Sequence, residues 1–368
     1  MTVRLLYVNP SPDRSERSIL NRLSSMGIII RALVSPDALA KNKTDFELID
    51  AHPIVFKGRV SSKNIDTISQ HLKDFNPNIS YFLTNQALTN GLVACKGFPT
   101  KVIAYRGIGA NFSILNPMAW MRYLNPRVDK IICVCKSIEQ SLKKTAYFKF
   151  IAPKSKLVTI YKGHDVSWYF SCSEDRVAPK RSEGTVRLIC VANWRPRKGL
   201  EVLIDAMDKL KPGLPVELVV IGRGVDQKKF QDRVNLSMYK DDIHLLGFRE
   251  DVISWVSSAD ISILPSLKRE GLPRSVIEAM SLGLPQIVSN IGGSPELVKN
   301  NIHGFITNPG DSSAIAHAIE WLLEHPVESK SMGRAAKERI INDFHIDETV
   351  NQLYELYISI LKAENKNN

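Results

Sequence analysis

Short apolar runs alternate with amphipathic stretches along the whole chain, and this alternation constrains the fold more than any other feature. Residues 3–8 and 261–264 are typical of strands, whereas residues 64–75 and 201–210 carry apolar side chains at helical spacing. Because strand and helix signals follow one another in turn, we expect parallel sheets covered by helices, which is an α/β fold.

The alternation runs in two series that a polar, aperiodic segment separates. That segment, residues 171–184, reads as an interdomain linker. We therefore expect an N-terminal Rossmann-like domain over residues 1–170, a second such domain over residues 185–345 and a final helical segment over residues 346–368. The expected strands lie at residues 3–8, 28–34, 53–56, 79–83, 101–105, 130–134 and 157–160, and then at 186–191, 217–221, 244–246, 261–264 and 285–288. Ligands bind such doubly wound sheets beyond the carboxyl ends of the strands.

Length and charge narrow the class of protein. A chain of 368 residues exceeds the usual size of one hydrophobic core, so two domains are the default expectation. Lys and Arg number 49 against 38 Asp and Glu, and the resulting charge of +11 favours an anionic partner or, equally simply, a solvated basic surface. The five scattered cysteines do not form a disulfide framework, and we expect buried thiols in a reducing compartment.

No signal peptide and no membrane-spanning run is visible in the sequence. We therefore expect a cytoplasmic protein, with any membrane contact peripheral on the inner face of the cell membrane. The stretch 143–156 favours such contact because it mixes five lysines with Tyr147, Phe148 and Phe150, although a solvated loop explains it as well.

The segment from Glu270 to Met280 carries the most specific signal. It follows the strand at 261–264, and its helix is expected to begin near Pro273, since proline suits the first helical turn. Glu270 then lies in the loop and Glu278 lies on the helix, on either side of free N–H groups that suit an anion. Sugar hydroxyls at both ends of a diphosphate would match this arrangement, so a nucleotide sugar is one ligand that fits. Ordinary acids at a helix start explain the pair equally well.

A basic turn at the end of the strand at 186–191 favours the nucleotide-sugar interpretation. Arg195, Arg197 and Lys198 lie where a departing diphosphate would need positive charge, and they could supply it without a metal. Glycine-containing turns follow the neighbouring strands at Gly222, Gly247 and Gly292, but Gly222 and Gly224 do not complete a dinucleotide fingerprint. A nicotinamide enzyme is therefore disfavoured.

Together these motifs resemble retaining glycosyltransferase family 4, whose members have the GT-B fold of two Rossmann-like domains, an interdomain cleft and a C-terminal crossover helix. The resemblance covers residues 186 to about 347 and rests on Glu270 and Glu278 with seven residues between them, followed and preceded by the glycine turns in the expected order. It implies a metal-independent enzyme that takes a UDP- or GDP-linked sugar and needs no cofactor beyond this substrate. The acceptor implied is a glycan or glycolipid precursor of a lipopolysaccharide or polysaccharide.

The resemblance also implies roles for individual residues. Glu270, Arg195 and Lys198 would be catalytic, with Glu270 on the transferred sugar and the two cations on the diphosphate. Glu278 would bind the ribose, and the rest of the donor site would be Gly222, Gly247, Phe248, Gly271, Leu272 and Pro273. Arg106 and Gly107 would lie on the acceptor side.

This sequence departs from the family pattern at three places. Ala192-Asn193 stands where many members have Gly-Arg, so Arg195 is expected to replace that arginine. The loop after the first strand, residues 9–15, has no glycine, and Arg106 stands where members often have His. Arginine stays protonated, so Arg106 would bind phosphate or hydroxyls, or form a structural ion pair, rather than act as a base.

Two other function classes fit parts of the sequence. A sugar-nucleotide epimerase would use the same nucleotide site but needs acid–base residues above the sugar, and no convincing His–carboxylate set is visible. A non-catalytic module for anionic ligands would explain the charge, but no aromatic nucleic-acid motif appears, so we do not expect a nucleic-acid partner.

Overall fold

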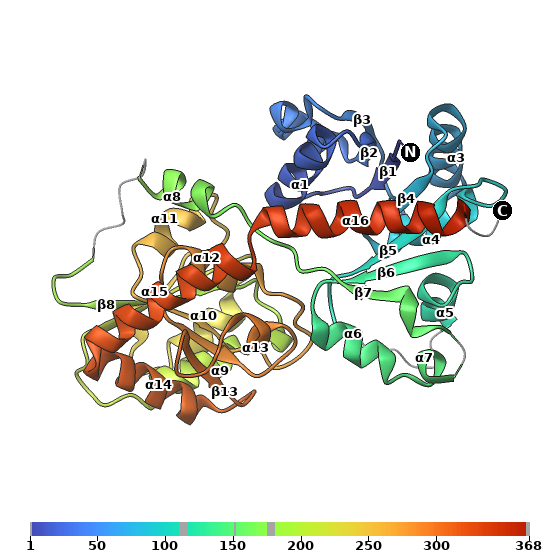
Figure 1. Ribbon diagram of the computed structural model, residues 1–368. Helices are drawn as coiled ribbons and strands as arrows, with labels where there is room; N and C mark the ends of the chain where they lie inside the picture. The colour runs from blue at the N-terminus through green and yellow to red at the C-terminus, as the bar shows by residue number, and fades with distance from the viewer. Residues whose placement is uncertain (1, 110–116, 151, 175–180, 366–368) are drawn as a thin grey trace. The chain divides into compact units, whose positions relative to one another are not determined.

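The chain divides into two compact units, each built on one parallel sheet (Figure 1). A computed structural model describes residues 2–109, 117–150, 152–174 and 181–365. Unit 1 comprises Met1–Gly163 and Ile346–Asn368, and unit 2 comprises His164–His345. The two Rossmann-like units confirm the expected α/β class.

Unit 1 contains a seven-stranded parallel sheet in the order β3-β2-β1-β4-β5-β6-β7. The strand order reverses between β1 and β4, which makes their carboxyl ends the switch point where doubly wound sheets bind ligands. The strands are β1 (Arg4–Val8), β2 (Ile29–Val34), β3 (Asp50–Pro53), β4 (Ile79–Phe82), β5 (Lys101–Arg106), β6 (Val128–Cys133) and β7 (Leu157–Thr159).

Helices cover both faces of this sheet. The last helix, α16 (Ile346–Asn365), lies beside α1 (Arg14–Ser25), and apolar residues of both helices join the strands in one core. The end of the chain therefore stabilises the N-terminal unit. The other helices are α2 (Pro36–Lys41), α3 (Ser62–Phe75), α4 (Asn85–Ala94), α5 (Pro117–Tyr123), α6 (Lys136–Lys143) and α7 (Ala146–Phe150), with 3-10 turns η1 (Lys43–Phe46) and η2 (Lys154–Lys156).

Unit 2 contains a six-stranded sheet in the order β10-β9-β8-β11-β12-β13, again parallel throughout. Its switch point lies between β8 and β11. The strands are β8 (Val186–Val191), β9 (Val216–Ile221), β10 (Ile243–Leu245), β11 (Ile261–Leu264), β12 (Gln286–Ser289) and β13 (Gly304–Thr307). The helices are α8 (Val166–Glu174), α9 (Leu200–Met207), α10 (Lys228–Val234), α11 (Val252–Ser257), α12 (Arg274–Ser281), α13 (Ser294–Leu297), α14 (Ser312–Glu324) and α15 (Pro326–Asp343), with η3 (Pro196–Lys198) and η4 (Lys240–Asp242).

Two strand expectations differ from the structure. The strand expected at 53–56 is wrong: β3 ends at Pro53, and proline, which has no N–H to donate, is confined to strand ends and edges. Strand β13 was not expected because it is short and begins with glycine. A Cβ at Gly304 would lie 1.9 Å from the Gln286 carbonyl oxygen, so only glycine allows this pairing.

The boundary between the units lies earlier than the expected linker. The chain passes from one unit to the other after Gly163, and helix α8 occupies the start of the segment expected as a linker. Residues 175–180 of that segment lie outside the described residues. None of the described helices is both long and apolar enough to cross a membrane.

The described thiols fit the expectation of buried cysteines. Cys95, Cys133, Cys135 and Cys190 are all buried and form no disulfide, while the side chain of Cys172 lies outside the described set. Burial raises the pKa of Cys95, Cys133 and Cys190 to about 12. They therefore stay protonated and unreactive near neutral pH.

Candidate active site

The loops that follow neighbouring strands of unit 2 are joined at the carboxyl end of the sheet. Each loop shares a backbone hydrogen bond of 2.8–2.9 Å with the next: Trp194 donates to Arg223, Gly222 to Gly247, Leu267 to Arg197, and Gly293 to Gly271. Strands β8 to β12 thus present one continuous surface of loops. Apart from Glu278, which lies on α12, the residues that the sequence assigned to the donor lie in or next to these loops.

Glycine allows two of these loops to approach their neighbours. Gly199 has φ +66°, and a Cβ there would lie 2.2 Å from the Pro265 carbonyl oxygen. Gly292 has φ +59°, and a Cβ there would lie 2.3 Å from the Glu270 carbonyl oxygen. A larger residue at either position would push away the loop that carries Glu270.

Glu270, which is buried, and Lys198, which is half-buried, form an ion pair. Lys198 Nζ lies 2.6 Å from Glu270 Oε1, and the same oxygen accepts a hydrogen bond from Ser266 Oγ at 2.5 Å. The Glu270 side chain is only 6% exposed and that of Lys198 17%. Two residues from the loops after β8 and β11 are therefore held together on either side of the switch point.

The backbone just before Glu270 is strained. Arg269 has φ +62°, a conformation that costs a non-glycine residue on the order of 1 kcal/mol. Arg197 supports it, because its Nη1 donates to the Arg269 carbonyl oxygen at 2.8 Å. This third cation of the basic turn thus positions the loop of Glu270.

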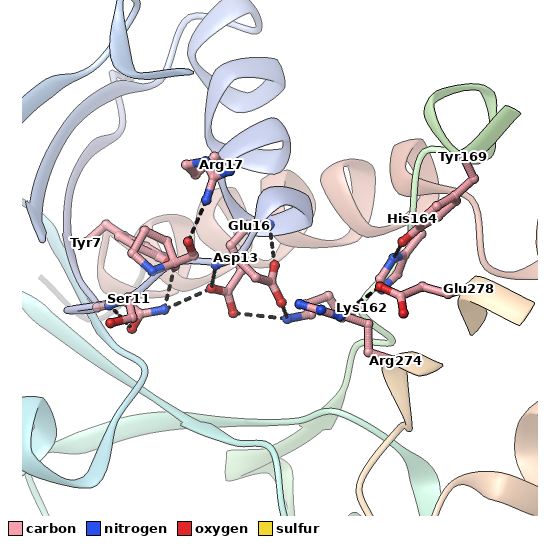
Figure 2. Close-up of polar contacts among 12 residues, drawn as sticks. Tyr7, Ser11, Asp13, Glu16, Arg17, Lys162, His164, Tyr169, Arg274 and Glu278 are labelled. Carbon is pink, nitrogen blue, oxygen red and sulfur yellow. Dashed lines mark hydrogen bonds and ion pairs between the residues drawn. The ribbon is translucent and has the colours of Figure 1, made fainter. Parts of the chain in front are cut away.

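Glu278 lies on α12 and pairs with a residue on the same helix. Its side chain is 7% exposed, and Arg274 Nε lies 2.9 Å from Glu278 Oε1 (Figure 2). Helix α12 begins after Pro273 with no side-chain cap. Gly271 and Pro273 are buried and Leu272 is half-buried, so the segment between the two glutamates is firmly packed.

The remaining donor-side residues lie on the same loop surface. Arg195 is exposed at the start of η3, and Asn193 Oδ1 accepts a hydrogen bond from the Arg223 N–H at 2.8 Å. Phe248 is 58% exposed after β10, with the Arg223 guanidinium 4.7 Å from its ring centroid. An exposed aromatic face beside cations suits a stacked base.

In unit 1, the expected acceptor-side residues lie at the end of β5. Arg106 is its last residue, and its guanidinium lies 4.9 Å from the centroid of the Tyr123 ring. Gly107 follows directly, next to the Tyr105 ring. Arg106 therefore has a cation–π partner, an interaction that the sequence did not reveal.

Unit 1 contains a half-buried charge cluster that was not expected from the sequence. The Lys162 ammonium lies between the carboxylates of Asp13 and Glu16, and the Glu16 contact measures 3.2 Å (Figure 2). Asp13 caps α1, and Glu16 completes a capping box with it. The spacing Asp-x-x-Glu was readable in the sequence, but the partner Lys162 is too distant along the chain to find.

The charged groups of this cluster shift one another's pKa values because they lie close together. Burial lowers the pKa of Lys162, but Glu16 and Asp13 outweigh burial and raise that pKa above its ordinary value. Burial also raises the pKa of Glu16, an effect that Lys162 opposes. The cluster borders a cavity of about 40 Å³ that Tyr7, Tyr81, Tyr105 and Tyr357 help to line. A space of this size suits ordered water rather than a sugar.

Within the described ranges, no group of three or more His, Cys, Asp or Glu side chains is placed to hold a metal ion. The cations of the β8 loop are among the positive charges that unit 2 carries at its switch point.

Comparisons with known proteins agree with this geometry. Residues 172–339 match the family model for glycosyl transferases group 1. These residues form a group 1 glycosyltransferase domain. The family expected from the sequence is thereby confirmed at the level of group 1, whereas membership of family 4 stays a prediction.

Curated proteins similar in sequence to this chain include a named glycosyltransferase. A UDP-Gal:α-D-GlcNAc-diphosphoundecaprenol α-1,3-galactosyltransferase of Escherichia coli is 33% identical over 145 residues, covering 39% of this chain and 37% of the relative. In three curated relatives the matched segments span between 37% and 57% of the relative's length.

Solved structures resemble the chain over nearly its whole length. A glycosyltransferase of Rickettsia africae ESF-5 gives a TM-score of 0.82 at 20% identity, covering 98% of this chain and 99% of that one. Anabaena HepE in complex with UDP-glucose gives 0.77 at 18% identity, covering 97% and 99%. These likenesses confirm the expected GT-B fold.

Proposed function

We propose that this chain is a retaining, metal-independent glycosyltransferase. It moves a sugar from a nucleotide-sugar donor to a hydroxyl of a glycan or glycolipid acceptor. The observation that carries the proposal is the largely water-excluded Lys198–Glu270 pair, set beside the switch point of the sheet in the group 1 domain.

The pair provides both halves of what a sugar diphosphate requires. Removing a charged pair from water costs desolvation free energy unless both partners also form hydrogen bonds, and Ser266 donates such a hydrogen bond to Glu270 here. When the donor binds, its phosphate can pair with the ammonium of Lys198, and its sugar hydroxyls can donate hydrogen bonds to the carboxylate of Glu270. Each charged group then exchanges one partner for another, so neither is left without a partner.

The main contribution of the protein to the reaction is to place positive charge beside the leaving diphosphate. The bond between the anomeric carbon and the diphosphate oxygen breaks, and the acceptor oxygen bonds to that carbon from the same face. The acceptor's proton passes to the leaving diphosphate, whose growing negative charge Lys198 and Arg195 stabilise. Glu278 holds the ribose, and Phe248 flanks the base of a UDP- or GDP-linked sugar.

Nucleotide binding offers the first test. Whichever of UDP and GDP the protein binds should stabilise it by roughly 2.7 kcal/mol at about a hundred times its Kd, if the nucleotide binds the folded state alone. We expect one of them to raise the melting temperature of the wild type and not that of Lys198→Ala. A nucleotide that stabilises both proteins equally would contradict the assignment of Lys198.

The donor found in this way allows the reaction to be tested. With a matching nucleotide sugar, proton NMR of the product should show the anomeric configuration of the donor, and EDTA should leave the rate unchanged. An inverted product, or activity that EDTA abolishes and added Mg²⁺ or Mn²⁺ restores, would refute that part of the proposal.

We also propose peripheral contact with the inner face of the cell membrane through α7. Phe150 is 74% exposed, and Lys149 lies 5.3 Å from its ring centroid. Lys144 and Lys154 nearby are exposed as well. The other two lysines of the basic stretch have partners within the protein: Lys143 pairs with Glu139, and Lys156 Nζ donates to the Val128 carbonyl oxygen at 2.7 Å. An exposed aromatic ring among cations suits an anionic interface.

Sedimentation with vesicles tests this contact. Vesicles containing phosphatidylglycerol should retain the wild-type protein and lose most of Phe150→Asp, because the new charge removes apolar insertion and opposes the surface potential. Leu236→Asp is the matched control, since Leu236 is 81% exposed but lies in unit 2. Equal retention of both variants would show that α7 is not the contact.

A further inference from the structure

The backbone of Arg223, in the loop after β9, is held from two sides. Its N–H donates to Asn193 Oδ1 at 2.8 Å, and its carbonyl oxygen accepts a hydrogen bond from the Trp194 N–H at 2.9 Å. The preceding residue, Gly222, donates from its N–H to the Gly247 carbonyl oxygen at 2.8 Å. Because β9 lies between β8 and β10 in the sheet, these bonds fix Arg223 between the loops that follow those two strands.

The guanidinium of Arg223 lies against an aromatic ring of the loop after β10. It is 4.7 Å from the centroid of the Phe248 ring, and both residues are exposed. A cation over an aromatic face is attracted by the ring but keeps its full charge. This contact therefore holds a positive charge at the surface of the loops, where a ligand can reach it.

Arg223 differs from neighbouring cations of unit 2 in having no acid as a partner. Three of those cations form ion pairs: Lys198 with Glu270, Arg249 with Asp251, and Arg274 with Glu278. Among the residues that the structure describes, no acid forms such a pair with Arg223. A guanidinium without an acid partner favours an anion, and its fork of N–H groups matches the oxygens of a phosphate.

The two ends of the proposed donor decide which phosphate Arg223 can reach. In the proposed function the base lies against Phe248, while the transferred sugar lies at Glu270 and Lys198. Along a nucleotide sugar, the order of groups is base, ribose, α-phosphate, β-phosphate and sugar. A guanidinium that starts beside Phe248 is therefore closer to the α-phosphate, and the ammonium that starts beside Glu270 is closer to the β-phosphate.

We infer that Arg223 binds the α-phosphate of the nucleotide donor. The inference rests on the proposed transferase function and adds to the donor site a cation that the sequence analysis did not assign. Lys198 and Arg223 then divide the diphosphate between them, one cation from the loop after β8 and the other from the loop after β9.

Binding of the base frees the guanidinium for this role. A base that stacks on the occupied face of Phe248 displaces Arg223, since only one group can contact that face of the ring. The hydrogen bonds to Asn193 and Trp194 involve the backbone of Arg223 and stay in place while its side chain moves. Arg223 thus exchanges an aromatic partner for an anionic one when the nucleotide binds.

Calorimetric titration with nucleotides of different length tests the inference without turnover. The wild type is titrated with UDP, UMP and uridine and with GDP, GMP and guanosine, the weaker ligands by competition with the diphosphate. In the series that binds, Arg223→Gln should weaken the diphosphate and the monophosphate by at least about tenfold each, the loss expected for one charge-assisted hydrogen bond. The nucleoside, which has no phosphate, should bind the variant at least as tightly as the wild type.

Arg334→Gln is the matched control, because it removes an exposed arginine of α15 and should leave all three affinities unchanged. Full affinity of Arg223→Gln for the monophosphate would overturn the inference, even if the diphosphate bound more weakly. Weaker binding of the nucleoside would also overturn it, since Arg223 would then hold the base. A wild type that binds neither series would refute the nucleotide donor itself, so the two failures are distinguishable.

Discussion

Replacing Glu270 by glutamine is expected to lower the rate of sugar transfer at least about a hundredfold, the usual cost of removing one preorganised electrostatic contact. Glutamine keeps the shape of the side chain, and its carbonyl oxygen can still accept the hydrogen bond from Ser266. The melting temperature should therefore change little. Steady-state rates at saturating donor measure the effect, with Lys240→Ala as a control, since Lys240 is an exposed lysine of η4.

Lys198→Ala should cost about as much, and the double variant should be scarcely slower than either single one. Two groups that act as a unit give strongly non-additive losses. Losses that multiply to about ten-thousandfold would show that Glu270 and Lys198 act independently. Near-normal turnover by either single variant would remove the pair from the reaction altogether.

Lys162→Met is expected to lower the free energy of unfolding by roughly 2–3 kcal/mol, somewhat less than a fully buried pair would cost, because Lys162 is 20% exposed. The change leaves the carboxylates of Asp13 and Glu16 close together without their cation. Urea unfolding followed by circular dichroism measures the loss. Lys63→Met, at an exposed site on α3, should have little effect.

The loss caused by Lys162→Met should depend on pH in a definite direction. Without the ammonium, burial and the charge of Asp13 keep the pKa of Glu16 above that of the unfolded chain, so protonation favours the folded variant. The difference from the wild type should therefore shrink as the pH falls from the raised pKa of Glu16 towards about 4, the ordinary value for a carboxyl. Adding Glu16→Gln should recover part of the stability at pH 7. A pH-independent loss, or no recovery, would show that lost packing and not charge explains the effect.

Local patterns were sufficient to predict most elements of the fold. The strands at 186–191 and 261–264 were found with correct bounds because they are continuous apolar runs. The strand expected at 53–56 failed because its apolar residues lie past the proline that ends β3, and β13 escaped notice because glycine carries no strand signal.

The site could be predicted as a set of loops but not as a set of contacts. Glu270 and Lys198 were both assigned to the carboxyl end of one sheet, since each follows a strand. Their pairing, and the support of Glu270 by Ser266, depend on β8 and β11 being neighbours, which no local pattern shows. Likewise Arg106 was singled out alone, and only the tertiary structure shows that its guanidinium contacts the ring of Tyr123.

The sequence by itself determined the class of the fold, its two units and the residue types gathered at the carboxyl end of the second sheet, because periodicity and turn chemistry act over a few residues. The tertiary structure alone decided which charged groups meet which partners: Lys198 with Glu270, Lys162 with Asp13 and Glu16, and Arg106 with the ring of Tyr123. The physical reason is that strand order brings together residues far apart in the chain, and electrostatic interactions depend on distance in space.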